Sequence, residues 1–572
     1  MANRMAQTPS QSHALLGPAD IVLTNGKIYT GVANHPWISG IAIRGEWIVA
    51  ITDFPDALKS SAFGSLIGPR TRVVDLHGQF AMPGFNDAHV HLAAAGYAKL
   101  EVNLEDTRSL SEFQQRIRDR VKDYKPGQWI TGRGWDHTLW PEKKFPSHQD
   151  LDAISADNPM IFVRVDGHVA VANSLALGLA GITVRTPDPP VGHIERDPGT
   201  GEPTGMLEED SAMNLVYSRV PPYTSDQRRR ALELATQEAV QYGVTSVQDN
   251  SVQETRDNSN FGWDNFLTLE QMRQEGNLNL RVTEWLPFDA PLERLEEMRR
   301  DGGASRAGVP GNTWLKTGPL KAFLDGSLGS RTAAMLAPYS DDPSTSGILR
   351  VDPEKLTQMA IERDRAGFQL AFHAIGDRAI RVALDTCAAV VTANGPRERR
   401  DRIEHAQVVA PLDFTRFAQL DVIASMQPSH LLEDARWATG RLGPKRSRGA
   451  YAWHTMERNG VHLAFGTDYP VESINPLRGL HACVTRELPE GDPQGGWNPQ
   501  EQLSMDQCIR AYTVGSAYAE FEESQKGTIA PGMLADIVVF PADSTRIPAR
   551  DLLTMRPTMT IVAGRIVYQP TQ

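Results

Sequence analysis

Five side chains with metal-binding chemistry, and one lysine, stand at or near the ends of apolar, strand-like segments. They are His89, His91, Lys321, His373, His405 and Asp468. Residues two apart on a strand share one face, so His89 and His91 can bind the same ion. Imidazole nitrogen and carboxylate oxygen suit zinc and other divalent first-row metals. A single strand-end histidine is more often a satisfied core residue, but this collected set predicts a metal centre.

These residues belong to strand-like segments that alternate with helix-like ones. The candidate strands are Gln79–Phe85, Gly243–Asp249, Leu278–Phe288, Leu320–Asp325, Phe368–His373, Arg402–His405, Val422–Gln427 and Leu463–Asp468. Several are near-continuous apolar runs, as strands buried on both faces should be. Eight strands alternating with amphipathic segments such as Ser225–Tyr242 predict an α/β fold, a parallel (β/α)8 TIM barrel rather than an open sheet. Catalytic side chains of such a barrel lie at the carboxyl ends of its strands.

The rest of the chain predicts further domains, because 572 residues exceed the roughly 250–300 that one hydrophobic core supports. Short β runs near both termini predict one β-sandwich built from the two ends, with two unrelated hairpins as the alternative. The long gap after the first strand predicts an inserted α/β subdomain that governs substrate specificity. The predicted boundaries are 1–18 for a flexible tail, 19–78 and 519–572 for the sandwich, 79–107 for barrel strand one and the segment after it, 108–222 for the insertion, and 223–518 for the remaining barrel.

The composition excludes two classes of partner. Lys and Arg total 58 against 70 Asp and Glu, a net charge of −12, which lacks the basic footprint that binding to a nucleic-acid backbone requires. No apolar run approaches the roughly 18 residues of a membrane-spanning helix. We therefore expect neither nucleic acid nor a membrane as a partner.

The cysteines and the N-terminus bear on the cellular compartment. Cys387, Cys483 and Cys508 form no close-spaced pair, so we expect small buried side chains without a disulfide or thiolate chemistry. Residues 1–17 contain no apolar core of a secretory signal. This predicts a cytoplasmic protein, or a periplasmic or secreted one if residues 2–6 are what remains of a trimmed signal.

The motifs along the chain resemble those of the amidohydrolase superfamily, and specifically its YtcJ-like branch (amidohydrolase family 3). The resemblance extends from Ala19 to Tyr568. The segments that carry it are Met82–His91, Lys321–Arg331, His373–Arg378, Ile403–Ala406, Gly466–Val471 and Gly527–Asp536. One such segment would be weak evidence, but their order and spacing make the resemblance strong.

The resemblance implies a binuclear metal centre, with two zinc ions or, alternatively, manganese or cobalt. His89 and His91 would bind the more buried ion, and His373 and His405 the more exposed one. Lys321, if carbamylated, would bridge the two ions, and Asp468 would bind the buried ion and move a proton. The plain alternative makes Lys321 an ordinary charged partner of Asp325, and Lys316 is a weaker candidate for the bridge.

The implied activity is hydrolysis of a C–N bond in an amide, formamide or N-acyl compound. A metal-activated hydroxide would attack the carbonyl, with Asp468 as the proton shuttle and His430 as a hydrogen-bond donor to the substrate. Trp135, His168 and Arg331 are candidates for substrate binding, although Trp135 and His168 fit a domain core equally well.

Two other functions stay open on the same sequence. One is a mononuclear deaminase or cyclic-amide hydrolase on the same scaffold, and the other is a non-catalytic metal-binding regulatory protein. The expected partner is a small-molecule amide, and we also expect a homodimer or a higher homo-oligomer.

Overall fold

The computed structural model describes residues 17–54, 57–59, 61–165, 167–190, 192–252, 262–303 and 312–570. These form two compact units, one made of Met1–Leu92 together with Thr236–Gln572, and the other of Ala93–Ala235. The predicted tail at 1–18 lies almost wholly outside the described residues. Each unit has its own sheets and its own core, so each is described by itself.

The first unit contains the predicted parallel barrel. Its eight-stranded sheet runs in the order β21-β20-β19-β18-β17-β16-β15-β8. The strands are β8 (Phe85–Val90), β15 (Val244–Asp249), β16 (Arg281–Pro287), β17 (Leu315–Phe323), β18 (Leu370–Ala374), β19 (Arg402–His405), β20 (Ile423–Met426) and β21 (Leu463–Phe465). Every ladder between neighbours is parallel. The predicted (β/α)8 architecture is therefore confirmed.

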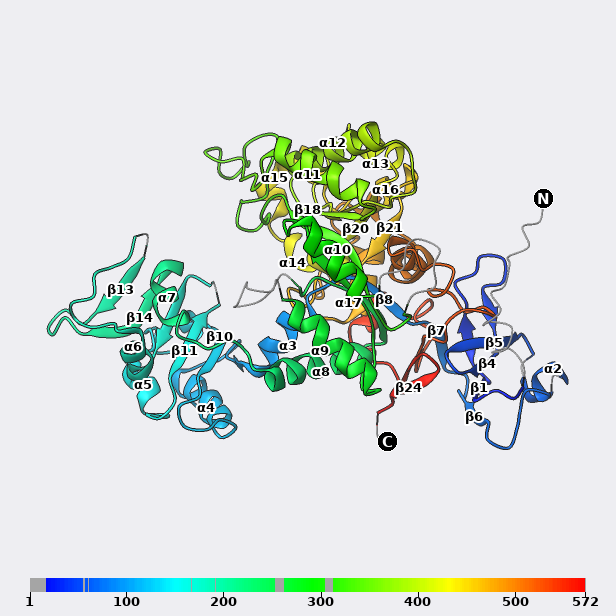
Figure 1. Ribbon diagram of the computed structural model, residues 1–572, viewed down its shortest axis with the longest axis horizontal. Helices are drawn as coiled ribbons and strands as arrows, with labels where there is room; N and C mark the ends of the chain where they lie inside the picture. Colours follow the sequence, from blue (N-terminus) through cyan, green and yellow to red (C-terminus); the bar gives the residue numbers. More distant parts are fainter. Residues whose placement is uncertain are drawn as a thin grey trace. The chain divides into compact units, whose positions relative to one another are not determined.

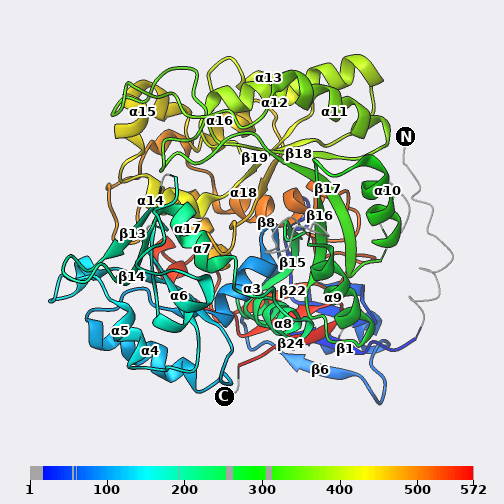
Figure 2. The same cartoon turned by 60° about the vertical axis from the view of Figure 1, so that its left-hand side comes forward.

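Helices alternate with these strands and follow the last of them, and the first helix spans the boundary between the two units. They include α8 (Ser225–Gln241), α9 (Trp263–Gln274), α10 (Leu292–Asp301), α11 (Pro353–Arg365), α12 (Asp377–Asn394), α13 (Phe414–Gln419), α14 (Leu431–Asp434), α15 (Ala438–Arg446), α16 (Trp453–Arg458), α17 (Pro476–Thr485), α18 (Met505–Arg510) and α19 (Ser516–Ala519). Figures 1 and 2 both show α11, α12 and α13 together beside β18. This arrangement leaves the strand ends as the place where polar side chains converge.

The first predicted strand needs a correction, because Gln79–Phe85 joins two strands of different sheets. Phe80–Pro83 forms β7 of the terminal sandwich, and the barrel strand β8 begins only at Phe85. Gly84 marks the change of sheet: a Cβ there would lie 2.2 Å from Thr245 Cγ2 on the neighbouring strand. An uninterrupted apolar run hides such a change of sheet, since both strands are buried.

The two chain ends build one β-sandwich, as predicted. One sheet has the order β5-β4-β1-β6, and the other the order β24-β23-β22-β7-β2-β3. The strands are β1 (Ile21–Thr24), β2 (Lys27–Tyr29), β3 (Trp37–Ile38), β4 (Gly40–Arg44), β5 (Trp47–Thr52), β6 (Arg72–Asp75), β22 (Ile537–Phe540), β23 (Met559–Val562) and β24 (Arg565–Tyr568). Apolar residues of both sheets, among them Leu23, Ile41 and Ile537, share a single core.

The second unit is the insertion, and it is an α/β unit as predicted. Its sheet has the order β13-β14-β12-β11-β10-β9. The elements are α3 (Leu92–Leu100), β9 (Val102–Asn103), α4 (Leu110–Val121), β10 (Ile130–Trp135), α5 (His148–Asp152), β11 (Met160–Arg164), β12 (Val169–Ala172), α6 (Ser174–Ala180), β13 (His193–Arg196), β14 (Pro203–Glu208) and α7 (Glu209–Tyr217). Two apolar clusters form its core.

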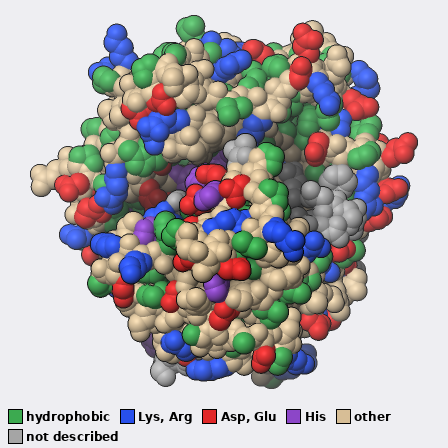
Figure 3. Space-filling model, turned by 90° about the vertical axis from the view of Figure 1, so that its left-hand side faces the viewer, with side chains coloured by type: hydrophobic (Ala, Val, Ile, Leu, Met, Phe, Trp, Pro, Cys, Tyr) green, Lys and Arg blue, Asp and Glu red, His purple; other side chains and the backbone are tan. Residues whose placement is uncertain are grey.

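The exposed side chains are mixed in charge. On the face drawn in Figure 3, acidic and basic side chains are interspersed. Among the described residues, no helix combines the length and the apolar character needed to cross a membrane.

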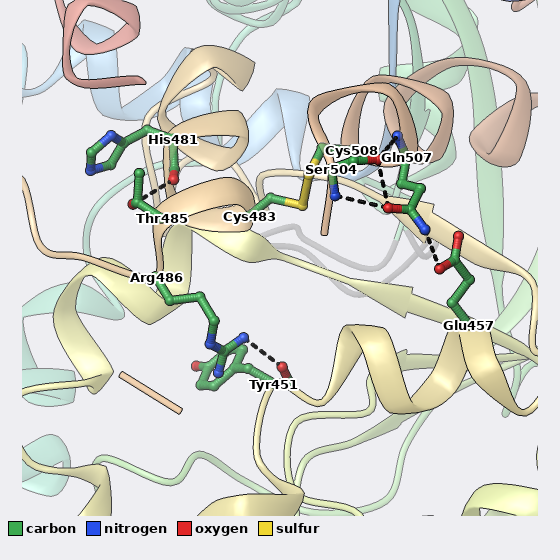
Figure 4. The surroundings of a disulfide bond; sticks show 9 residues. All are labelled: Tyr451, Glu457, His481, Cys483, Thr485, Arg486, Ser504, Gln507 and Cys508. Atoms are coloured by element: carbon green, nitrogen blue, oxygen red, sulfur yellow. Dashed lines mark hydrogen bonds between the residues drawn. A yellow bond between two sulfur atoms is a disulfide. The ribbon is translucent and has the colours of Figure 1, made fainter. Parts of the chain in front are cut away.

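The cysteine expectation was wrong for two of the three residues. Cys483 of α17 and Cys508 of α18 form a disulfide, while Cys387 is a buried free thiol. The two cysteines are 25 residues apart in sequence and meet only because the two helices pack together, which spacing alone does not reveal. Figure 4 shows α18 held from its start as well, where Ser504 and Gln507 cap each other and Gln507 contacts Glu457 of α16.

Removing the disulfide should destabilise the barrel unit. We expect replacement of Cys483 and Cys508 together by alanine to lower the free energy of unfolding by about 3 kcal/mol, the usual effect of releasing a loop of this size. Denaturant unfolding of the variant, and of wild type before and after reduction, measures the effect. Alkylation in denaturant should label one thiol before reduction and three afterwards. Three reactive thiols without reductant would contradict the bond.

The barrel closes between its first and last strands through backbone and side-chain hydrogen bonds. Asp468 N donates to His89 O at 2.8 Å, and His91 N donates to Tyr469 O at 2.7 Å. The buried carboxylate of Asp87 accepts hydrogen bonds from Thr467 N and Oγ1 at 2.9 and 2.6 Å. Gly466 makes this approach possible, because a Cβ there would lie 2.6 Å from both Asp87 Oδ1 and His89 N.

A methyl group at position 466 should therefore force the closing strands apart. Overpacking of this kind costs roughly 1–3 kcal/mol or more, so Gly466→Ala should lower the denaturation midpoint clearly. The matched control is Gly440→Ala in α15, where a Cβ meets nothing within 4 Å and stability should be unchanged or slightly raised. Equal midpoints for the two variants would contradict the role of Gly466 in closure.

Candidate metal centre

The closure of the barrel brings one carboxylate to the first pair of predicted ligands. Asp468 Oδ1 lies 3.1 Å from His91 Nε2 and 3.6 Å from His89 Nε2. One ligand atom from each of these three residues lies within 4.8 Å of the other two. Asp468 reaches this position with a positive φ of 60°, in the bend that follows β21. Such left-handed backbone at a non-glycine residue is typical of functional sites.

A second group forms on the other side of the same carboxylate. His405, His430 and Asp468 also place ligand atoms within 4.8 Å of one another. His430 Nε2 is buried, makes no hydrogen bond and lies 3.5 Å from Asp468 Oδ2. His405 Nδ1 lies 2.8 Å from Gln427 Oε1, which fixes its ring with Nε2 available as a ligand. His430, expected to contact substrate, thus lies in this group, which does not include His373.

His373 lies beside the second group with a different orientation. Its ring packs against that of His405 with centroids 4.5 Å apart. Its Nε2 lies 3.2 Å from Gly326 O and 3.4 Å from Asp325 Oδ1. Because a carbonyl oxygen only accepts hydrogen bonds, this geometry leaves Nδ1 as the nitrogen that can bind a metal.

Lys321 of β17 lies inside the site. Its Nζ is 3.2 Å from His89 Nε2, and the residue is 1% exposed. The alternative partner, Asp325, uses its carboxylate to accept hydrogen bonds from three backbone N–H groups, those of Ala334, Ile375 and Gly376. Lys316 lies elsewhere, with its Nζ 2.6 Å from Glu522.

The electrostatics of the site suit a divalent cation. Burial, reinforced by the charge of Lys321, lowers the pKa of His89 to about 4 and that of His373 to about 3. Burial likewise lowers the pKa of His405 well below its usual value. Burial alone would raise the pKa of Asp468, but the hydrogen bond from His91 and the neighbouring histidines hold it well below its usual range. Neutral imidazoles and one carboxylate form a donor set that fits zinc and similar metals.

Two polar residues around the site were not found from the sequence. Glu404 Oε2 lies 2.7 Å from His89 Nδ1, with both side chains buried. Asn250, at the end of β15, is fully buried and neither polar atom of its amide makes a hydrogen bond. A sequence signal existed only for Glu404: charged residues at alternate positions of the short strand Arg402–His405 are unusual in a barrel core.

The three candidates for substrate binding fall in different settings. Trp135 is 0% exposed in the core of the inserted unit, and its Nε1 donates to Phe162 O at 2.9 Å. The core alternative is therefore supported for Trp135. His168 has a 68% exposed side chain beside Glu209, and Arg331 pairs with Asp341. A substrate-binding role for His168 or Arg331 stays a prediction.

Comparison with known proteins places this site in a family. Residues 72–568 match the amidohydrolase family. Protein LONG AFTER FAR-RED 3 of Arabidopsis thaliana is 36% identical over 96% of this chain and 92% of its own length. The putative amidohydrolase YtcJ of Bacillus subtilis is 31% identical, covering 95% of this chain and 98% of its own. N-substituted formamide deformylase of Arthrobacter pascens is 25% identical, covering 96% and 99%.

A solved structure agrees with these sequence matches. An uncharacterized metal-dependent hydrolase from Pyrococcus horikoshii superposes with a TM-score of 0.73 at 29% identity, over 92% of this chain and 99% of that one. The match therefore covers nearly all of both chains. This chain belongs to the amidohydrolase family, in its YtcJ-like branch.

Proposed function

We propose that this protein is a metal-dependent hydrolase that cleaves the C–N bond of an amide, formamide or N-acyl compound. The observation that carries the proposal is the position of Asp468, whose two oxygens face two separate groups of histidines. The formamide deformylase among the relatives and the amidohydrolase family match support a carbonyl substrate attached to nitrogen.

The chain's own residues divide into those that hold the metal and those that move protons. His89, His91 and Asp468 would hold one ion, and His405 with His430 or His373 a second. When bound, a divalent cation supplies an acidified water at neutral pH and polarises the substrate carbonyl. The proposal includes zinc as the metal, with manganese or cobalt as alternatives.

Asp468 is the proton carrier in this proposal. Its carboxylate is ionised at neutral pH, because its pKa lies well below the usual range. It accepts a proton as the water oxygen bonds to the carbonyl carbon, and it returns that proton to the nitrogen as the C–N bond breaks. The products are a carboxylic acid and an amine, so atoms and charge balance. In the arrangement in which His373, and not His430, holds the second ion with His405, His430 would donate a hydrogen bond to the substrate.

We further propose that Lys321 carries a carbamate that bridges the two ions. Support comes from its burial and from the 3.2 Å separation between its Nζ and His89 Nε2. An ammonium group at that distance repels any cation held by His89, whereas a carbamate is a bidentate anion that attracts two cations. Forming it consumes one carbon dioxide and releases one proton from the amine.

The disulfide supports an oxidising compartment for this protein. Disulfides persist in secreted and periplasmic proteins and are rare where thiols are kept reduced. The Cys483–Cys508 bond therefore supports the periplasmic or secreted alternative over the cytoplasmic one.

The proton-carrying role predicts that the Asp468→Asn variant folds normally but loses most of its catalytic activity. The amide can still contact a cation but can neither accept nor return the proton, so kcat should fall by roughly 10²–10⁴-fold. A panel of formamides and N-acyl amines, assayed with Zn²⁺, Mn²⁺ or Co²⁺, identifies the activity of wild type first. Circular dichroism and metal analysis then check that the variant folds and still binds metal.

The control is the same chemical change at an exposed aspartate, Asp106→Asn, whose side chain is 81% exposed. That variant should retain wild-type kcat. An Asp468→Asn protein with wild-type turnover would contradict the proton-carrying role, and a wild type inactive on the whole panel would contradict the proposed substrate class.

A further inference from the structure

We propose that Glu404, held in place by Arg402, is a positioning residue for His89 and sets which nitrogen of His89 binds metal. This inference rests on the proposed metal-dependent function and goes beyond it, since neither residue is among the predicted ligands. The claim is that a buried carboxylate keeps the proton on His89 Nδ1, which leaves the lone pair on Nε2.

The contact between Glu404 and His89 is short, and both side chains are buried. Glu404 Oε2 lies 2.7 Å from His89 Nδ1, and the two side chains are 0% and 1% exposed. Both oxygens of Glu404 also accept hydrogen bonds from Arg402, Nε to Oε1 at 2.5 Å and Nη2 to Oε2 at 3.3 Å. A carboxylate that accepts from an arginine on both oxygens has no proton to give, so Nδ1 of His89 must be the donor.

The other nitrogen of His89 then faces the metal centre. Nε2 lies 3.6 Å from Asp468 Oδ1 and 3.2 Å from Lys321 Nζ. A histidine that gives its Nδ1 proton to a carboxylate is a more basic and better oriented metal ligand through Nε2. The contact between Glu404 and Nδ1 therefore assigns Nε2 as the atom of His89 that binds metal.

Arg402 fixes the position of Glu404 from several strands at once. Its Nη2 donates to Ser425 Oγ at 2.7 Å on β20 and to Ala88 O at 2.8 Å on β8. Its Nη1 donates to Gln248 Oε1 on β15, and its guanidinium lies 4.7 Å from the centre of the Trp285 ring on β16. These partners on four other strands fix the position of the Arg402 side chain. Arg402 in turn fixes the position of the Glu404 carboxylate.

A purely structural role is the competing explanation. A buried ion pair is weak evidence for stability, because well-packed apolar side chains often serve as well. What an apolar pair does not supply is an acceptor for His89 Nδ1. The experiment must therefore read out the state of His89 as well as the stability of the barrel.

The test compares Glu404→Gln with the double variant Arg402→Met/Glu404→Leu. The double variant leaves no unpaired buried charge, so it covers the case in which the single variant does not fold. In the single variant the glutamine oxygen accepts from Arg402 Nε, as Glu404 Oε1 does in wild type, so its NH2 group faces His89 Nδ1 and favours the proton on Nε2. In the double variant leucine offers Nδ1 no acceptor. Zn²⁺ affinity, measured by competition with a chelator, should be about 10–100-fold weaker in both variants than in wild type.

A second readout follows the tautomer of His89 directly. Metal-free protein labelled with ¹⁵N in its histidine rings should show His89 protonated at Nδ1 in wild type, with the signal assigned by its loss in His89→Asn. The signal should change to the Nε2-protonated form or to a mixture in both Glu404 variants. Ser425→Ala is the matched control: it removes one hydrogen bond from Arg402, leaves Glu404 and His89 intact, and should change neither readout.

The outcomes separate this inference from the proposed function. Zn²⁺ affinities within about threefold of wild type in the folded Glu404 variants, or an unchanged His89 tautomer, would overturn the positioning role. The tautomer readout needs no metal, so it decides the role even for a wild type that binds no Zn²⁺. That last result would contradict the proposed function instead.

Discussion

The metal centre depends on the closure of the barrel between β8 and the segment that follows β21. The backbone hydrogen bonds of Asp468 and Tyr469 to His89 and His91 join residues nearly 380 positions apart in the chain. They set the distance between the carboxylate of Asp468 and the two histidines, because all three side chains extend from the two backbone segments that these bonds join. Gly466 permits the approach, and the buried carboxylate of Asp87 fixes it. Function at this site is thus a consequence of how the sheet closes.

Burial controls which side chains of the metal centre are charged. The histidines lie out of water, and their pKa values fall far enough to keep them neutral at pH 7. Burial alone would also raise the pKa of Glu404, but the charge of Arg402 lowers it to about 2. The interior therefore contains neutral imidazoles next to two ionised carboxylates. Asp468 faces the metal centre, and Glu404 contacts the opposite side of the His89 ring. A divalent cation is the partner that such a set of donors attracts.

Much of this could be predicted from the sequence because strand ends and residue types are local signals. The apolar runs indicate the eight strands, and the polar residues after them indicate the site, since parallel strands bring their carboxyl ends to one edge. The change of sheet at Gly84 could not be predicted, because both strands it joins are equally apolar. The disulfide could not be predicted either, since it depends on how α17 packs against α18.

Within the site, sequence order says which strand a residue follows but not which way its ring turns. His373 and His405 follow neighbouring strands, yet His430 joins His405 and Asp468, while His373 turns Nε2 toward Gly326. Trp135 has the aromatic and polar character of a pocket wall but belongs to a core. Glu404 is adjacent to a predicted ligand in sequence, and only its distance to His89 reveals its contact. The pattern of apolar and polar residues along the sequence therefore does not predict how these side chains are oriented.

The central claim, that the closed strands form a divalent metal site, is tested most directly by diffraction at the zinc absorption edge from crystals of the protein grown with Zn²⁺. We expect an anomalous peak about 2.0–2.2 Å from His89 Nε2, His91 Nε2 and an oxygen of Asp468. We also expect a second peak beside His405, with density for a carboxyl group on Lys321 Nζ between the two. Anomalous peaks only elsewhere on the chain, or none at all, would contradict it.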